Sequence, residues 1–216
     1  MTERDLYEML ARAVIDGDAR TSESLAKDVV KAGLDPLMAI QEGLSKGIRK
    51  VGEEFTKGML FLPDLMLAAE ATQAGMKVLL PEVEKKGTGV KVFLGRVALG
   101  TVAGDIHSIG KSLVGAFLAA NNFQVIDLGE DVADEVFIQR ARECDILGLS
   151  ALLTTTMQKQ RDVIEDLKEA GLKEKVKVRV GGAVTSATWA SEIGADAYGA
   201  DAATAVARAK ELLRRT

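Results

Sequence analysis

The chain has 216 residues, of which 47% are hydrophobic and 28% charged, and its formal net charge is −4. It contains one histidine and one cysteine. These counts exclude an internal disulfide, a zinc finger and a cysteine-ligated iron–sulfur centre, because each of these needs several such residues. An acidic chain with 4% aromatic residues also lacks the basic, aromatic surface that is typical of nucleic-acid-binding proteins.

The N-terminal part of the chain, to about residue 86, predicts helices. Apolar residues recur there at helical spacing in about four stripes. Glycines interrupt the pattern at Gly17, Gly33 and Gly58. Asp35-Pro36 is a typical helix start, with aspartate as N-cap and proline in the first turn. Helices joined by short connections predict an antiparallel bundle.

A polar, charged and glycine-rich segment follows at residues 84–89. Such a composition is typical of loops, so we expect this segment to link two domains. The predicted domains are a helical domain over residues 1–87 and a second domain over residues 88–216.

In the second domain, apolar strands alternate with helical patterns. Strands are expected at residues 96–102, 124–127, 145–150, 176–180 and 195–198. Helices are expected at residues 109–120, 135–142 and 156–170, around Trp189, and at 202–213. Repeated strand–helix units predict an α/β fold, a flavodoxin-like doubly wound parallel five-stranded sheet that is covered on both faces. Ligands bind such sheets beyond the carboxyl ends of the strands, at the switch point.

The sequence gives no sign of a signal peptide or a membrane span. The polar, acidic start lacks the basic and apolar regions of a secretory signal, and no apolar run is long enough to cross a bilayer. We therefore expect a cytoplasmic protein that has neither a membrane nor a nucleic acid as partner.

The sequence does not match three common kinds of site: a phosphate-binding loop, a serine hydrolase triad and a catalytic cysteine. A phosphate-binding loop needs four residues between its glycines, whereas five separate Gly104 from Gly110, and Asp105 would repel a phosphate. A serine hydrolase triad would have to use His107, but the sequence has no Gly-x-Ser-x-Gly elbow. Cys144 precedes the third strand, at the wrong end of the sheet for the expected site, and is predicted to be a small buried residue.

Asp105 and His107 lie two positions apart just after the first strand, at the expected ligand edge. A carboxylate that accepts a hydrogen bond from one ring nitrogen leaves the other nitrogen able to bind a metal or to accept a proton. Spacing alone leaves two interpretations open. His107 is either such a functional group or a loop histidine beside a helix-capping aspartate.

Three short motifs fall at the ends of predicted strands: Asp105-x-His107-x-x-Gly110, Ser150-x-Leu152 and Gly181-Gly182. Their order and spacing resemble the signature of cobalamin-binding domains of the methionine synthase type. The helical N-terminal part resembles the cap domain of the same family. The whole chain is thus similar to the small corrinoid proteins of anaerobic methyltransferase systems.

The resemblance implies a role for each motif residue. His107 would be the lower axial ligand of cobalt in a base-off, His-on cobalamin or related corrinoid. Asp105 would accept the hydrogen bond from the other ring nitrogen, and Thr156 would be the third member of this relay. Relatives often carry aspartate directly after the histidine, where this chain has Ser108, but that position lies outside the signature.

The resemblance also implies which residues receive the displaced nucleotide tail and which cover the cobalt. The implied tail-binding residues are Gly110, Ser150, Leu152, Thr154, Gly181 and Gly182. Met59, Phe61 and Leu65 are implied to cover the upper face of the cofactor, although an apolar stripe at helical spacing is more often core. Trp189 is as readily explained by packing as by contact with the tail.

A corrinoid protein of this kind carries a methyl group on cobalt and is not an enzyme by itself. The implied partners are a substrate-specific methyltransferase, a second methyltransferase that passes the methyl group to a thiol or tetrahydrofolate, and a reductive activator. The methyl donor stays open among methylamines, betaines, methanol and methoxylated aromatics, and Thr154-Thr155-Thr156 resembles amine-type systems. Two alternatives remain: a cobalamin-dependent sensor, and a nucleotide- or flavin-binding module with a structural histidine.

Overall fold

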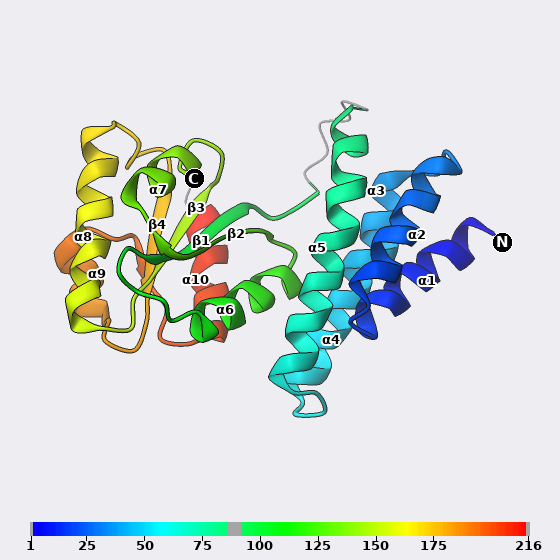
Figure 1. Cartoon of the computed structure of the whole chain (residues 1–216), viewed down its shortest axis with the longest axis horizontal. Coiled ribbons are helices and arrows are strands. Elements are labelled where there is room, and N and C mark those ends of the chain that lie inside the picture. The colour runs from blue at the N-terminus through cyan, green and yellow to red at the C-terminus, as the bar shows by residue number, and fades with distance from the viewer. Residues whose placement is uncertain (1, 86–91, 215–216) are drawn as a thin grey trace. The chain divides into compact units, whose positions relative to one another are not determined.

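A bundle of helices precedes an α/β sheet along the chain in the computed structural model (Figure 1). The structure describes residues 2–85 and 92–214, and in Glu84 the backbone only. Contacts divide the chain into one unit of Met1–Val92 with Ala119–Asn122 and another of Phe93–Leu118 with Phe123–Thr216. The predicted boundary at residue 87 lies outside the described residues and stays a prediction.

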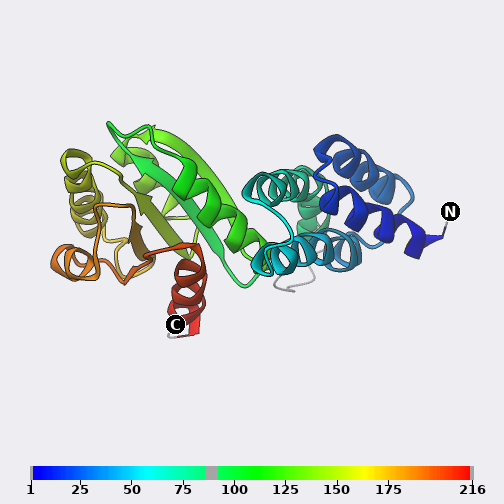
Figure 2. The same cartoon turned by 90° about the horizontal axis from the view of Figure 1, so that it is seen from below.

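The first unit is the predicted helical bundle, whose helices lie side by side in Figure 2, coloured blue to teal. Its elements are α1 (Glu3–Ile15), α2 (Ala19–Lys31), α3 (Pro36–Met38), the π-helical η1 (Ala39–Ser45), α4 (Lys46–Thr56) and α5 (Leu62–Lys85). Asp35 caps α3 as predicted, because its carboxylate accepts the Leu37 N–H at 3.1 Å. The predicted linker begins too early, since α5 continues through Lys85, and its remainder lies outside the described residues.

Glycines let the helices of this unit approach closely. A Cβ on Gly43 would lie 2.7 Å from Leu10 Cδ2, and one on Gly47 would lie 2.7 Å from the Ala11 carbonyl oxygen. Real side chains do not tolerate such distances, so these two positions require glycine where the η1–α4 segment crosses α1. The fully buried residues around this crossing include Leu10, Val14, Ile40, Leu44, Ile48 and Val51.

The second unit contains the predicted parallel sheet. Its strands are β1 (Arg96–Val102), β2 (Gln124–Val132), β3 (Ile146–Ser150), β4 (Lys177–Gly181) and β5 (Ala197–Tyr198). All pairings are parallel, and the strand order is β2-β1-β3-β4-β5, which confirms the flavodoxin-like prediction. Strand β2 is longer than the sequence predicts, because it continues through Val132.

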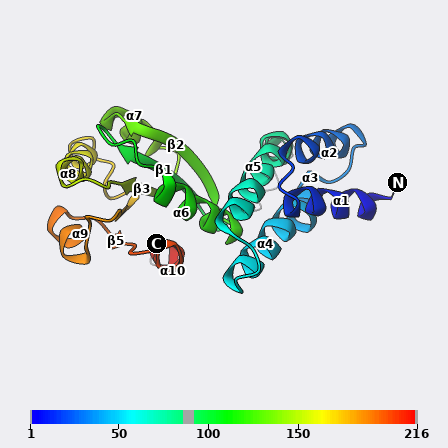
Figure 3. The same ribbon diagram turned by 60° about the horizontal axis from the view of Figure 1, so that its bottom comes forward.

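Five helices cover the two faces of this sheet (Figure 3). They are α6 (Ile109–Ala120), α7 (Asp134–Arg140), α8 (Thr154–Glu169), α9 (Ala187–Ile193) and α10 (Ala202–Arg214). Helices α6 and α10 pack with Val97, Leu99 and Ile146 on one face. Helices α7, α8 and α9 pack on the other face around Phe137 and Leu147. Within the described residues, no helix is both long and apolar enough to span a membrane.

The topology predicts where a ligand binds. Strand β1 pairs with β2 on one side and with β3 on the other, so the connections after β1 and β3 leave the sheet in different directions. Loops that part at such a switch point leave a crevice at the carboxyl ends of the strands. The motifs around His107, Leu152 and Gly182 follow β1, β3 and β4, and all three lie at this edge.

A buried glutamine connects helices α8 and α9 to this edge of the sheet. Gln160 of α8 is fully buried, and its Nε2 donates to the carbonyl oxygens of Leu149 and Gly181 at 3.0 and 3.1 Å. Its Oε1 accepts the Trp189 indole N–H at 2.9 Å. One side chain therefore joins β3, β4, α8 and α9. This contact also places Trp189 in the core, where Arg161 lies 4.8 Å from its ring centroid.

We predict that Gln160→Ala lowers the free energy of unfolding by about 2–4 kcal/mol, because it removes three hydrogen bonds from the buried edge, including the one that the Trp189 indole N–H donates. Urea unfolding followed by circular dichroism measures this effect. Gln158→Ala is the matched control, since Gln158 lies on the exposed face of the same helix. Equal stabilities of the two variants would contradict the role of Gln160 at this edge.

Candidate cobalamin site

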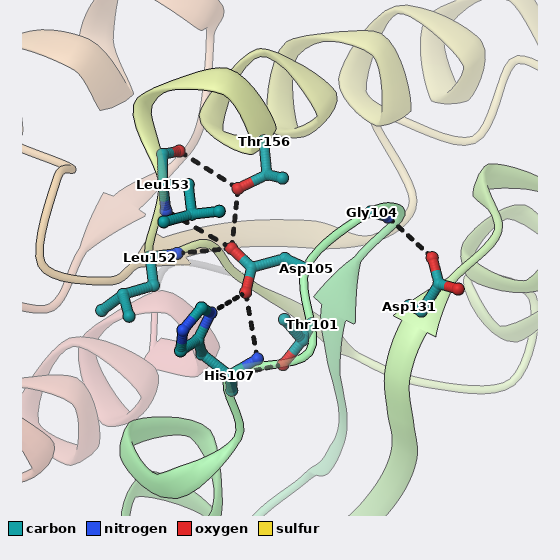
Figure 4. A network of polar contacts seen from close by, with 8 residues as sticks. All are labelled: Thr101, Gly104, Asp105, His107, Asp131, Leu152, Leu153 and Thr156. Carbon is teal, nitrogen blue, oxygen red and sulfur yellow. Dashed lines mark hydrogen bonds and ion pairs between the residues drawn. The ribbon is translucent and has the colours of Figure 1, made fainter.

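The loop after β1 is held in place by the end of β2 (Figure 4). Gly104 adopts a φ of 80°, a left-handed conformation that favours glycine. Its N–H donates to Asp131 Oδ1 at 2.6 Å, and the Asp131 N–H donates back to the Asp105 carbonyl oxygen at 2.9 Å. These reciprocal bonds fix the turn that directs the Asp105 side chain into the protein.

The Asp105 carboxylate is buried, and donors from two loops and α8 surround it. Oδ2 accepts the Leu152 N–H at 2.7 Å and the Thr156 hydroxyl at 2.6 Å. The Leu153 N–H lies farther away, at 3.4 Å from the same oxygen. Oδ1 accepts the His107 N–H at 3.0 Å. Residue exposure of Asp105 is 1%, so water contributes almost nothing to this site.

These donors determine the charge of Asp105. Burial by itself would raise the pKa of the carboxyl group, because it disfavours the charged form. The hydrogen bonds from Thr156, Leu152 and His107 outweigh that effect and hold the pKa well below its usual range. Asp105 is therefore an anion at neutral pH and faces the imidazole ring of His107.

His107 is the partner of this anion. Its Nδ1 lies 2.7 Å from Asp105 Oδ1. In the neutral tautomer that donates to this carboxylate, the ring proton is on Nδ1 and Nε2 keeps its lone pair. The Thr101 hydroxyl donates to the His107 carbonyl oxygen at 3.1 Å and fixes the backbone. The side chain is 47% exposed, so the ring is oriented from inside the protein but is open to a ligand.

Apolar side chains surround the exposed ring. Four of them are partly or largely exposed: Ile106 (71%), Ile109 (76%), Leu152 (37%) and Leu153 (42%). Exposed apolar residues that gather around one polar group mark a binding surface more often than a free surface. A broad, largely apolar ligand would fit this region with a metal or proton acceptor at its centre.

A cavity of about 900 Å³ opens beside His107. The start of α6, the ends of β3 and β4 and the start of α10 line it. The predicted residues Gly110, Ser150, Leu152, Gly181 and Gly182 are all among its lining residues. The structure thus brings together the three motifs around one cavity and one histidine.

Two of the three predicted glycines, Gly110 and Gly182, play different parts at this cavity. A Cβ on Gly110 would meet no heavy atom within 4 Å, so the protein itself leaves that space open. A Cβ on Gly182 would lie 1.7 Å from the Ala151 carbonyl oxygen, and its φ is 126°. Glycine at position 182 is therefore required by the packing of β4 against the end of β3, whether or not a ligand is bound.

Other predicted residues are not among the lining residues of the cavity. Thr154 is exposed at the start of α8 and is not among the lining residues, so its contact with a ligand stays a prediction. In the helical unit, Met59 and Phe61 are 60% and 73% exposed, whereas Leu65 is 1% exposed. The surface therefore presents two of the three predicted cap residues, and the third is buried. Cys144 is buried as predicted, and burial raises the pKa of its thiol to about 11.

Sequence reasoning missed two buried cations that line the cavity. Lys111 of α6 is 6% exposed and forms an ion pair with Asp127 of β2. Arg179 of β4 is also 6% exposed. Nothing in the local sequence marks either residue, because Lys111 follows a helix start and Arg179 alternates with valines as a solvent-facing strand residue would.

The donor set fits a cofactor that brings its own metal ligands. Within residues 2–85 and 92–214, no group of three His, Cys, Asp or Glu side chains could hold a metal ion. Imidazole is a suitable ligand for first-row transition metals, but a single imidazole holds one only when other ligands complete the coordination. A corrin ring supplies such ligands around cobalt, and the apolar surface around His107 and the adjacent cavity suit its ring and its tail.

Comparison with known proteins identifies the family. Two models, each described as a B12 binding domain, match residues 6–80 and 95–207. The chain belongs to the B12-binding corrinoid proteins. The resemblance seen in the three strand-end motifs is thereby confirmed, and the family decides against the alternative of a nucleotide- or flavin-binding module.

Relatives cover nearly the whole chain. A corrinoid protein of Desulfitobacterium hafniense is 47% identical over 96% of this chain and 97% of its own length. A trimethylamine corrinoid protein of Methanosarcina barkeri is 45% identical over 93% of both chains. The methanol:cobalamin methyltransferase complex of the same organism contains a chain that is 28% identical, with a TM-score of 0.80, covering 100% of this chain and 82% of that one.

We predict that Thr156→Ala destabilises the protein by about 1.5–3 kcal/mol, since it removes a donor from a buried carboxylate. Chemical unfolding at pH 7 measures this loss. Thr155→Ala is the control, because Thr155 is exposed in the same helical turn. If Thr156→Ala were as stable as the control, the Thr156 hydroxyl would not be a significant partner of Asp105.

Proposed function

We propose that this protein carries a methyl group on the cobalt of a bound corrinoid, with His107 as the lower ligand of that cobalt. The observation that supports this most directly is the Asp105–His107 pair, in which a buried carboxylate orients an imidazole side chain that is 47% exposed. When bound, the corrinoid would supply the cobalt centre that accepts and gives up the methyl group. The protein's own residues would bind, orient and protect it.

Asp105 and Thr156 would tune the ligand. A carboxylate that accepts the Nδ1 proton raises the basicity of Nε2 and fixes the plane of the ring. Thr156 donates to the same carboxylate at 2.6 Å and limits how much charge Asp105 offers to the histidine. A proton held between Nδ1 and Oδ1 would compensate changes of charge at the group bound to Nε2.

The cavity would hold the nucleotide tail that His107 displaces. It starts beside His107 and continues between α6, α10 and the sheet, with Gly110 leaving its mouth open. Ser150 and Leu152 line it close to the histidine. This arrangement supports a base-off, His-on state, because a base held in the cavity could not coordinate cobalt at the same time.

The proposed partners follow from the relatives. One relative is named for trimethylamine and a structural neighbour for a methanol:cobalamin methyltransferase complex. We place this chain between a methylamine-specific methyltransferase and a second methyltransferase that passes the methyl group to a thiol or tetrahydrofolate. A reductive activator would restore the reduced cobalt after accidental oxidation. The exposed Met59 and Phe61 would shield the methyl group from water.

A methylation assay tests the carrier role. Reconstituted with cobalamin and reduced, the chain should accept a methyl group when trimethylamine and its methyltransferase from the Methanosarcina system are added. The visible spectrum of the cofactor reports the transfer. A cobalamin-dependent sensor, the alternative function, would bind cobalamin but would not be methylated with any methylamine or matching methyltransferase.

Loss of a residue that only hydrogen-bonds to a metal ligand weakens metal binding roughly 10–100-fold. His107→Ala removes the proposed ligand itself, so it should weaken cobalamin binding by at least as much. It should also change the spectrum of the bound cofactor. Thr155→Ala is the control and should alter neither, because Thr155 is exposed and does not line the cavity. An unchanged spectrum and affinity in His107→Ala would show that the histidine is not the lower ligand.

A further inference from the structure

The guanidinium of Arg179 lies in the wall of the cavity, and no hydrogen bond joins it to any residue of 2–85 or 92–214. The residue is 6% exposed, and its Nη1 is a buried nitrogen with no hydrogen bond. Among the described residues, the side chain also makes no ion pair. An unpaired buried arginine is costly, because the loss of hydration is not repaid by a counter-charge.

Gly199 makes room for the end of this side chain. A Cβ on Gly199 would lie 2.9 Å from Arg179 Nη1, closer than real side chains tolerate. Arg179 stands opposite Gly148 of β3 in the sheet, and a Cβ there would lie in ordinary contact with Nη2, at 3.6 Å. Both glycines line the same cavity. The backbone at Gly199 therefore accommodates the guanidinium closely, and its remaining donors are left to whatever enters the cavity.

The charge of Arg179 is not neutralised by its surroundings. Burial lowers its pKa to about 10, which still leaves it protonated at neutral pH. Asp201 is the one carboxylate among the cavity's described lining residues, and it is exposed and accepts the Thr204 N–H at 2.7 Å. Lys111, the other buried cation, already has Asp127 as its partner.

The position of Arg179 indicates which part of a ligand it meets. Arg179 precedes Gly181, the last residue of β4, by two residues. At the rise of a strand, this places it roughly 7 Å along β4 from the sheet edge where His107 lies. A corrinoid held by His107 would therefore reach Arg179 with the far end of its tail, which is the lower base. A guanidinium only donates hydrogen bonds, so it needs an acceptor on the edge of that base.

We propose that Arg179 makes this protein select corrinoids whose lower base carries a hydrogen-bond acceptor at its outer edge, such as a hydroxybenzimidazole or a purine. The dimethylbenzimidazole of cobalamin presents two methyl groups there and leaves the guanidinium unpaired. This inference rests on the proposed function, and it assigns the base specificity to one residue that the three family motifs do not contain.

Binding titrations with corrinoids that differ only in the base test the inference. We expect the wild-type chain to bind 5-hydroxybenzimidazolyl cobamide or adeninyl cobamide roughly 10–100-fold more tightly than cobalamin, the range expected for a hydrogen bond to a charged group. Arg179→Met should lose this preference. Cobinamide, which has no tail, should bind equally to both proteins.

The unliganded protein gives a second measurement. Removing an unpaired buried charge should raise the Tm of Arg179→Met above that of the wild type, whereas a purely structural arginine would lower it. Arg179→Lys, measured alongside, keeps the charge without the planar fork of donors and should retain only part of the preference.

Three results would overturn the inference. One is an equal affinity of the wild type for all tail-bearing corrinoids, and another is the same preference in Arg179→Met. A uniform loss of affinity for every tail-bearing corrinoid in that variant would instead assign Arg179 to the phosphodiester. All three leave the proposed function intact, since each requires that corrinoids bind; a chain that binds no corrinoid at all would contradict the proposed function itself.

Discussion

The buried carboxylate of Asp105 is the interaction on which the site depends. It joins the loop after β1, the loop after β3 and the first turn of α8, because it accepts hydrogen bonds from His107, Leu152 and Thr156. Its negative charge is tolerated in the interior only because these donors replace water. The same charge orients the imidazole, so one residue both joins the loops at the switch point of the sheet and orients the proposed metal ligand.

The sequence predicts most of this architecture because its periodic signals agree with the packing. The bounds of β1 and α6 match the expected ranges, since an apolar run and a helical stripe define them. The extension of β2 to Val132 was missed because β2 is an edge strand, and its second half carries Gly129, Glu130 and Asp131 in place of apolar residues. The end of α5 was missed because polar residues continue a helix as readily as they form a linker.

The motifs in the sequence predicted the residues around His107. The sequence did not predict the burial of residues that only the packing of distant elements covers. His107, Asp105 and Thr156 come together as the resemblance implied. Arg179 was missed because Lys177-Val-Arg-Val reads as a strand with one solvated face, whereas α6 and α10 cover that face. Leu65 belongs to an apolar stripe in which some residues are exposed and others are buried. The periodicity of the sequence does not show which of these residues pack in the core.

The single histidine makes the central claim directly measurable. Labelling the protein with ¹⁵N-histidine labels only the His107 ring. We predict that the electron paramagnetic resonance spectrum of bound cob(II)alamin shows a three-line nitrogen splitting from ¹⁴N that becomes a two-line splitting on labelling, as axial ligation by His107 would require. A three-line splitting that persists after labelling would show that the cofactor's own base ligates cobalt, and it would contradict the assignment of His107 as the lower ligand.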